Sequence, residues 1–201
     1  MKRLAIFAAL AAFAAAAQAA PSTYNIDNSH TYPHFTYSHL GYSIQTHKFD
    51  KTSGKIVMDF DAKTGSVDVA IDATSVNTGF PLFNEHIQAA DYFDTARYPT
   101  ITFKSSSMKF KGNQPVSLMG DLTIKGVTQP VTLEVTHFKC MPHPMLKAPA
   151  CGANAMTKVK RSDFNMGKYA FLVSNDITLN LALKAFKAQP VMQLASRDPV
   201  Q

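Results

Sequence analysis

The sequence predicts an all-β protein, an antiparallel barrel of about eight strands with one short helix at one end. Three observations support this fold. Apolar and polar residues alternate with period two along most of the chain, short glycine-containing turns separate the alternating runs, and only one segment has a helical pattern. Strands with one apolar face pair antiparallel, and closing such a sheet removes its exposed edges. The pattern alone leaves a β-sandwich open as the alternative.

The first nineteen residues are expected to be a signal peptide rather than part of the fold. Lys2 and Arg3 precede the apolar run Leu4–Ala17, and Ala17-Gln18-Ala19 has the small-x-small pattern of a cleavage site. The run is short and weakly apolar for a membrane anchor. We therefore expect a periplasmic protein with one domain over residues 20–188 and a C-terminal tail over 189–201, where the alternation ends.

Six runs carry most of the alternation. Their large apolar side chains fall on one face in each run: Phe35 and Tyr37; Ile56, Met58 and Phe60; Val67, Val69 and Ile71; Val116, Leu118, Leu122 and Ile124; Val131, Leu133 and Val135; Ile177, Leu179, Leu181 and Leu183. The turn sequences between runs include Thr52-Ser53-Gly54, Lys63-Thr64-Gly65, Lys111-Gly112-Asn113 and Lys125-Gly126.

The helical pattern lies within residues 84–103. Ile87, Ala90 and Tyr92-Phe93 recur near helical spacing, with Glu85-His86 at the expected helix start and Asp91 and Asp94 at its end. Pro99 excludes further helix, and the alternation of Ile101 and Phe103 then predicts a strand. A single helix in a chain of strands could cover the mouth of a closed barrel that holds a ligand.

The only two cysteines, Cys140 and Cys151, flank a proline-rich loop. In an oxidising compartment this pair favours a structural disulfide, which would stabilise the fold by somewhat less than about 3 kcal/mol. A redox-active pair is disfavoured because the chain has no Cys-x-x-Cys motif.

The charge pattern argues against nucleic-acid binding. Without Lys2 and Arg3 the chain has 18 basic and 14 acidic side chains, and the basic residues are scattered. The only tight group, Lys158, Lys160 and Arg161, has no interleaved aromatic residues on which bases would stack. A mildly basic, solvated exterior instead favours contact with anionic lipid head groups.

Neither a metal site nor a catalytic motif is evident. The seven histidines form no His-x-His or His-Glu-x-x-His pattern, and no serine lies in a Gly-x-Ser-x-Gly elbow. The acidic pairs Asp59/Asp61 and Asp91/Asp94 fall at expected turns or helix ends. An enzyme acting on a hydrophobic substrate, with His39 or His86 as acid/base, is the alternative to a binding protein.

A series of short motifs runs in order over residues 24–185. The motifs are Tyr24-Asn25-Ile26-Asp27 with His30, Phe35-x-Tyr37-x-His39-Leu40-Gly41, Phe49-x4-Gly54-x-Ile56, Asp72-Ala73-x-Ser75-Val76, Glu85-His86-Ile87, Asp91-Tyr92-Phe93-Asp94, Tyr98-Pro99-x-Ile101-x-Phe103, Gly120–Val131 and Arg161-Ser162-Asp163-Phe164. This ordered set resembles the YceI family of periplasmic, lipocalin-like, polyisoprenoid-binding proteins. The resemblance implies an elongated antiparallel barrel, without a cofactor, that holds a polyisoprenoid, isoprenoid quinone or fatty-acid-like chain.

Three features depart from the family pattern. Phe83 and Gln88 stand where arginines are common beside the helix, and His47 stands where a glycine is common. The loop between Cys140 and Cys151 resembles an insertion. Losing the arginines removes bidentate donors for an anionic head group, so the apolar chain is the better-supported part of the ligand.

The inward-phased residues are the candidate lining of an apolar cavity. The expected wall comprises Phe35, Tyr37, Phe49, Phe60, Val69, Ile71, Ile101, Phe103, Leu122 and Ile124; the expected lid, Phe83, Ile87 and Phe93; and the expected far rim, Phe164, Tyr169 and Phe171. For each residue singly, ordinary core packing is the alternative.

The resemblance also suggests partners. A carrier of this kind would exchange its lipid with a membrane surface or a membrane redox protein. A scavenger of hydrophobic toxicants would use the same cavity, and no feature of the sequence specifies an oligomer.

Overall fold

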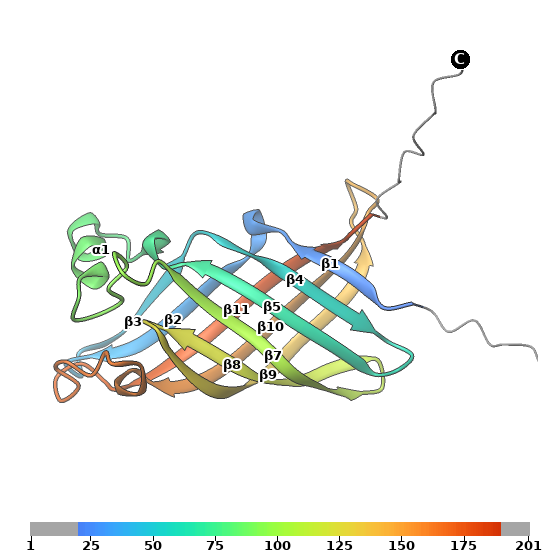
Figure 1. Ribbon diagram of the computed structural model, residues 1–201. Helices are drawn as coiled ribbons and strands as arrows, with labels where there is room; N and C mark the ends of the chain where they lie inside the picture. Colours follow the sequence, from blue (N-terminus) through green and yellow to red (C-terminus); the bar gives the residue numbers. More distant parts are fainter. Residues whose placement is uncertain (1–19, 190–201) are drawn as a thin grey trace, which may run out of the picture.

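Eight strands form a closed antiparallel ring in the computed structural model, which describes residues 20–189 (Figure 1). Around the ring they are β1 (Ser22–Ile26), β4 (Thr52–Asp59), β5 (Thr64–Asp72), β7 (Thr100–Lys111), β8 (Gln114–Ile124), β9 (Val127–Pro142), β10 (Pro149–Lys160) and β11 (Asp176–Lys187). The predicted antiparallel barrel is confirmed, and the continuous ring is incompatible with a sandwich. The expected signal peptide and all but the first residue of the expected tail lie outside the described residues.

Three further strands extend the sheet at one end. The long strand β11 pairs with β1 through Ala185, opposite Ile26, and with β2 (Tyr32–His39) through Leu179, opposite Phe35. The short 3-10 helix η1 (Asn28–His30) separates β1 from β2. From β2 the sheet continues to β3 (Ser43–Phe49) and then to the two-residue strand β6 (Val76–Asn77), which follows the 3-10 helix η2 (Ala73–Ser75).

The single α-helix of the described chain, α1 (Pro81–Gln88), begins before the predicted segment. Pro81 occupies the first turn, where its fixed φ suits a helix and its missing N–H costs nothing. Asn84 accepts a hydrogen bond from the backbone of Thr78 at 2.8 Å, which joins the helix to the preceding turn. The expected start at Glu85-His86 was therefore wrong, since both residues lie in the second half of the helix. Tyr92 and Phe93 lie beyond its end, in turns.

The two ends of the barrel carry different structures (Figure 1). The helix end comprises α1, the β2–β3 turn, the β8–β9 turn and the segment 161–175, which starts with the 3-10 helix η3 (Arg161–Phe164). The disulfide end comprises the β4–β5, β7–β8 and β9–β10 turns. There Cys140 and Cys151 face each other on β9 and β10 with a Cα–Cα distance of 4.0 Å and are bonded, which confirms the predicted structural disulfide.

The core lies inside the ring. Its main cluster joins inward side chains of β2, β3, β5, β7, β8, β9 and β11 with Ile87 of α1 and Phe164 of η3. A smaller cluster at the disulfide end contains Tyr24, Met58, Cys151 and Ala185. The interior is thus filled by packed side chains at the disulfide end.

Candidate functional site: an apolar cavity in the barrel

An apolar cavity of about 350 Å³ occupies the barrel interior, a volume within the usual range for small-molecule sites. Strands on all sides contribute to it because alternate residues of every strand point inward. All but two of the predicted residues line it: Phe35, Tyr37, Phe49, Val69, Ile71, Phe83, Ile87, Phe93, Ile101, Phe103, Leu122, Ile124, Phe164 and Tyr169.

Phe60 does not line the cavity. Alternation predicted it to follow Ile56 and Met58 inward, and both of those residues do face the cavity. The strand, however, ends at Asp59, and Phe60 lies in the following turn, where its ring packs 6.3 Å from that of Phe138. The period of two ceases to apply once the strand ends, so this part of the prediction was wrong.

The prediction for Phe171 was also wrong, as was the prediction of a far rim to which Phe171 belonged. Its side chain is 83% exposed and outside the cavity. Segment 161–175 lies beside the region that follows α1, because Lys168 forms an ion pair with Asp91 and Lys125 donates to the carbonyl oxygens of Ala90 and Asn165. Phe164 and Tyr169 therefore line the helix end of the cavity rather than a far rim.

Much of the wall opposite the predicted residues comes from the last three strands, which the predicted wall omitted. The sequence signal was present for the residues of β9 and β11, which belong to the alternating runs, whereas no run was assigned to β10. The omitted residues are Val131, Leu133, Val135, Ala155, Val159, Leu179 and Leu181.

Two buried basic side chains of the interior were missed, and the first is His47. It lies two residues before Phe49 on β3, so it points inward, and it is only 5% exposed. Its Nε2 is 3.0 Å from the hydroxyl oxygen of Tyr37, while its buried Nδ1 has no hydrogen-bond partner among residues 20–189. Burial lowers the pKa of His47 and raises that of Tyr37, so both side chains stay neutral at pH 7.

The second is Arg161, which was assigned to the surface with Lys158 and Lys160. Arg161 lies just after the end of β10, in η3, yet it lines the cavity and is only 8% exposed. Its guanidinium donates to the carbonyl oxygens of Ser174 at 3.1 Å, Lys168 at 2.8 Å, Val173 at 3.0 Å and Met166. Burial lowers its pKa. Arg161 thereby fastens segment 161–175 to the barrel through backbone acceptors.

The cavity reaches the surface at the helix end. Its exposed lining residues are His39, His86, Lys168 and Tyr169, which come from the end of β2, from α1 and from segment 161–175. The residues that line it toward the disulfide end, such as Met58, Pro115 and Phe138, are buried or half-buried. The site is therefore a deep apolar chamber whose mouth lies at the helix end, where His86 packs on Phe83 and Tyr92.

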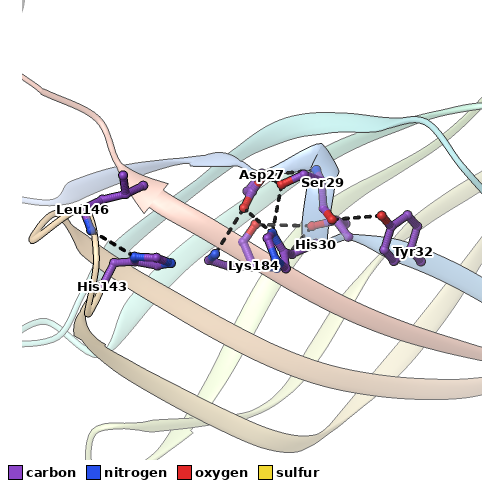
Figure 2. Close-up of polar contacts among 8 residues, drawn as sticks. Asp27, Ser29, His30, Tyr32, His143, Leu146 and Lys184 are labelled. Carbon is purple, nitrogen blue, oxygen red and sulfur yellow. Dashed lines mark hydrogen bonds and ion pairs between the residues drawn. The ribbon is translucent and has the colours of Figure 1, made fainter.

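The described residues hold no group of three or more His, Cys, Asp or Glu side chains placed to bind a metal ion. A Ser–His–Asp group does occur on the outer wall, where Asp27, Ser29 and His30 meet (Figure 2). Ser29 and Asp27 approach the same nitrogen of His30, Nδ1, at 2.8 and 3.0 Å. A catalytic relay uses the two ring nitrogens separately, so this group lacks the required geometry and instead caps η1.

A comparison with family models covers nearly all of the described barrel. The model of the YceI-like domain matches residues 24–185 of this chain. The chain belongs to the YceI family. The helix end, the interior wall and the disulfide described above are therefore features of a YceI-family barrel.

Relatives and solved structures extend this likeness. Protein YceI of Shigella flexneri is 33% identical over 181 residues, which cover 89% of this chain and 93% of the relative. A UPF0312 protein of Vibrio parahaemolyticus is 33% identical over 153 residues, 75% of this chain and 79% of the relative.

Burkholderia cenocepacia BcnA superposes with a TM-score of 0.69 at 25% identity and covers 79% of this chain and 98% of its own. A polyisoprenoid binding domain from Saccharophagus degradans has the same fold, with a TM-score of 0.61 at 21% identity over 82% of this chain and 98% of its own. Within residues 20–189, no helix is both long and apolar enough to cross a membrane.

Proposed function

We propose that this YceI protein is a periplasmic carrier that holds one long apolar lipid chain, such as a polyisoprenoid, an isoprenoid quinone or a fatty-acid-like tail, inside its barrel. The observation that carries the proposal is the deep apolar chamber inside the barrel. Each CH₂ group removed from water contributes roughly 0.8 kcal/mol, so a deep wall of aliphatic and aromatic side chains favours a long chain over a compact polar ligand.

Two further observations support the proposal. The Saccharophagus domain with the same fold is described as polyisoprenoid binding. The disulfide suits an oxidising compartment such as the periplasm, in line with the signal peptide expected at residues 1–19. Tyr37 and Arg161 line the chamber, and His47, which is hydrogen-bonded to Tyr37 and packs against Phe83 of α1, lies at the same end, where the polar end of an amphiphile would remain.

The direct test is organic extraction of the gently purified protein followed by mass spectrometry. We expect a long-chain apolar molecule in near-stoichiometric amount, and binding of added isoprenoid quinone or polyprenol to the extracted protein. Absence of both would contradict the proposal. Turnover of a lipid substrate that disappears in His39→Ala or His86→Ala, with the fold intact, would instead favour the enzyme alternative.

A matched pair of variants tests whether the chamber is the binding site. Ala155 of β10 faces the cavity, whereas Ala70 of β5 points outward between the inward residues Val69 and Ile71. Ala155→Phe should fill the chamber and lower lipid affinity by about tenfold or more, and Ala70→Phe should leave it unchanged. Equal affinity in both variants would place the ligand elsewhere.

A further inference from the structure

The two loops that frame the mouth expose large apolar side chains. Tyr42 and Ile44 of the β2–β3 turn region are 88% and 68% exposed, and Phe171 and Leu172 of segment 161–175 are 83% and 48% exposed. None of these four lines the cavity. Their exposure therefore serves neither the core nor the chamber, and exposed groups of this kind commonly mark interaction surfaces.

Backbone hydrogen bonds join the two loops into one surface. The N–H of Leu40 donates to the carbonyl oxygen of Leu172 at 3.2 Å, and that of Ser174 donates to Ser38 at 3.0 Å. An isolated bridge also pairs His39 with Val173. The apolar side chains thus extend from a shared and braced base, at the rim from which His39 and Tyr169 line the cavity.

The charge and composition of this surface fit a lipid bilayer. Residues 39–44 and 166–174 contain no Asp or Glu, and their one lysine or arginine, Lys168, is paired with Asp91. Aromatic side chains such as Tyr42 and Phe171 suit the boundary between head groups and acyl chains. A surface with so little net charge would bind through apolar insertion and would depend little on anionic lipid.

We infer that the β2–β3 turn and segment 166–174 form a membrane-docking surface that places the mouth of the chamber against the bilayer. This inference rests on the proposed function, because a carrier of membrane lipid needs a path that keeps the apolar chain out of water. Tyr42, Ile44, Phe171 and Leu172 enter the bilayer boundary, and the lipid then passes directly between the membrane and the chamber.

Because the chain contains no tryptophan, single tryptophans can report which end docks. Phe171→Trp places one at the proposed surface, and Met145→Trp places one on the β9–β10 turn at the disulfide end, where Met145 is 85% exposed. On addition of phosphatidylcholine vesicles, emission of Phe171→Trp should shift to the blue and be quenched by lipids with brominated acyl chains, while Met145→Trp should not respond. The response should persist at high salt.

The charge variants Phe171→Glu and Tyr42→Glu should weaken vesicle binding by about tenfold or more, and Met145→Glu should have no effect. All three should load dispersed isoprenoid quinone as the parent protein does, since none of these residues lines the chamber. Only the first two should take up quinone from vesicles more slowly.

Three outcomes would overturn the docking surface. If the protein loads dispersed quinone but neither tryptophan responds to vesicles, the carrier stands and the docking surface fails. An equal response at both ends also contradicts it. A blue shift without vesicles, accompanied by a dimer that Phe171→Glu dissociates, would assign the surface to a second copy of the chain. A vesicle response confined to Phe171→Trp without any quinone loading would support the docking surface while refuting the carrier.

Discussion

The two ends of this barrel are closed by different kinds of interaction. At the disulfide end, a covalent cross-strand bond and a packed cluster around Met58 seal the interior. At the helix end, hydrogen bonds of Arg161, a Tyr37–His47 pair and a short helix surround an opening. The end through which a ligand would pass is therefore held by interactions that depend on buried charge and protonation, whereas the opposite end is closed by a covalent bond and apolar packing.

Among variants that test this difference between the two ends, Arg161→Met should have the largest effect on stability. Because the guanidinium supplies four hydrogen bonds to backbone carbonyls, its loss should lower the free energy of unfolding by about 3 kcal/mol or more. Hydrogen exchange should rise first in residues 166–174. Arg161→Lys should restore little, because an ammonium group lacks the planar set of donors. Full stability in the lysine variant would contradict this role.

The second-largest loss of stability is expected when the disulfide is removed by the double substitution Cys140→Ser and Cys151→Ser. The two cysteines are 11 residues apart, and for so short a loop the free energy of unfolding should fall by somewhat less than about 3 kcal/mol. Thermal or denaturant unfolding measures the loss. Lipid occupancy should stay the same, since the cystine does not line the chamber. A drop in occupancy without unfolding would mean that the two ends are coupled.

Mild acid should destabilise the helix end through His47. Burial lowers its pKa in the folded state, so the unfolded state binds a proton first as the pH falls below about 6.5. The contribution of neutral His47 is therefore complete above that pH and decreases below it, until the folded-state pKa is reached. His47→Gln, which keeps an acceptor for Tyr37, should flatten the stability profile between pH 7.5 and 5. An unchanged profile would refute this assignment.

The smallest effect is expected from Asp27, on the outer wall next to the disulfide end (Figure 2). It follows β1, whose partner Ala185 on β11 lies opposite Cys151. Burial would raise its pKa, but hydrogen bonds from Ser29, His30 and Lys184 outweigh that and hold it at about 2. Asp27 therefore stabilises the fold fully above its ordinary pKa of 3.8, and this stabilisation is lost as the pH falls through about 2.

Asp27→Asn should accordingly be less stable than the parent protein at pH 6, by a margin that disappears near pH 2. Denaturant unfolding at several pH values measures it. A margin that is constant with pH would show that the carboxylate charge is not what matters. As the pH falls, the free energy of unfolding should therefore begin to decrease near pH 6.5 through His47, whereas the contribution of Asp27 decreases only below its ordinary pKa of 3.8.

Most of the residues predicted to line the cavity do line it, because inward alternation is a local property. Val69, Ile101 and Leu122 could each be assigned from their own strand. The prediction failed where a strand ended, as at Phe60, and where a polar side chain occupied an inward position. His47 obeys the alternation of β3, but its residue type suggested only a departure from the family pattern. Arg161 follows the end of β10, and its residue type suggested a solvated surface.

The sequence by itself determined the antiparallel strands, the pairing of the two cysteines and most of the inward set, because a period of two decides which face of a strand each side chain takes. Closure of the sheet into a ring rather than a sandwich was decided by the tertiary structure. Only the tertiary structure decided which end is open and what surrounds it. The position of segment 161–175 depends on contacts with residues far away in the chain, such as Lys125 with Asn165 and Lys168 with Asp91. Such contacts leave no periodic trace in the sequence, since closure of the sheet alone brings the partners together.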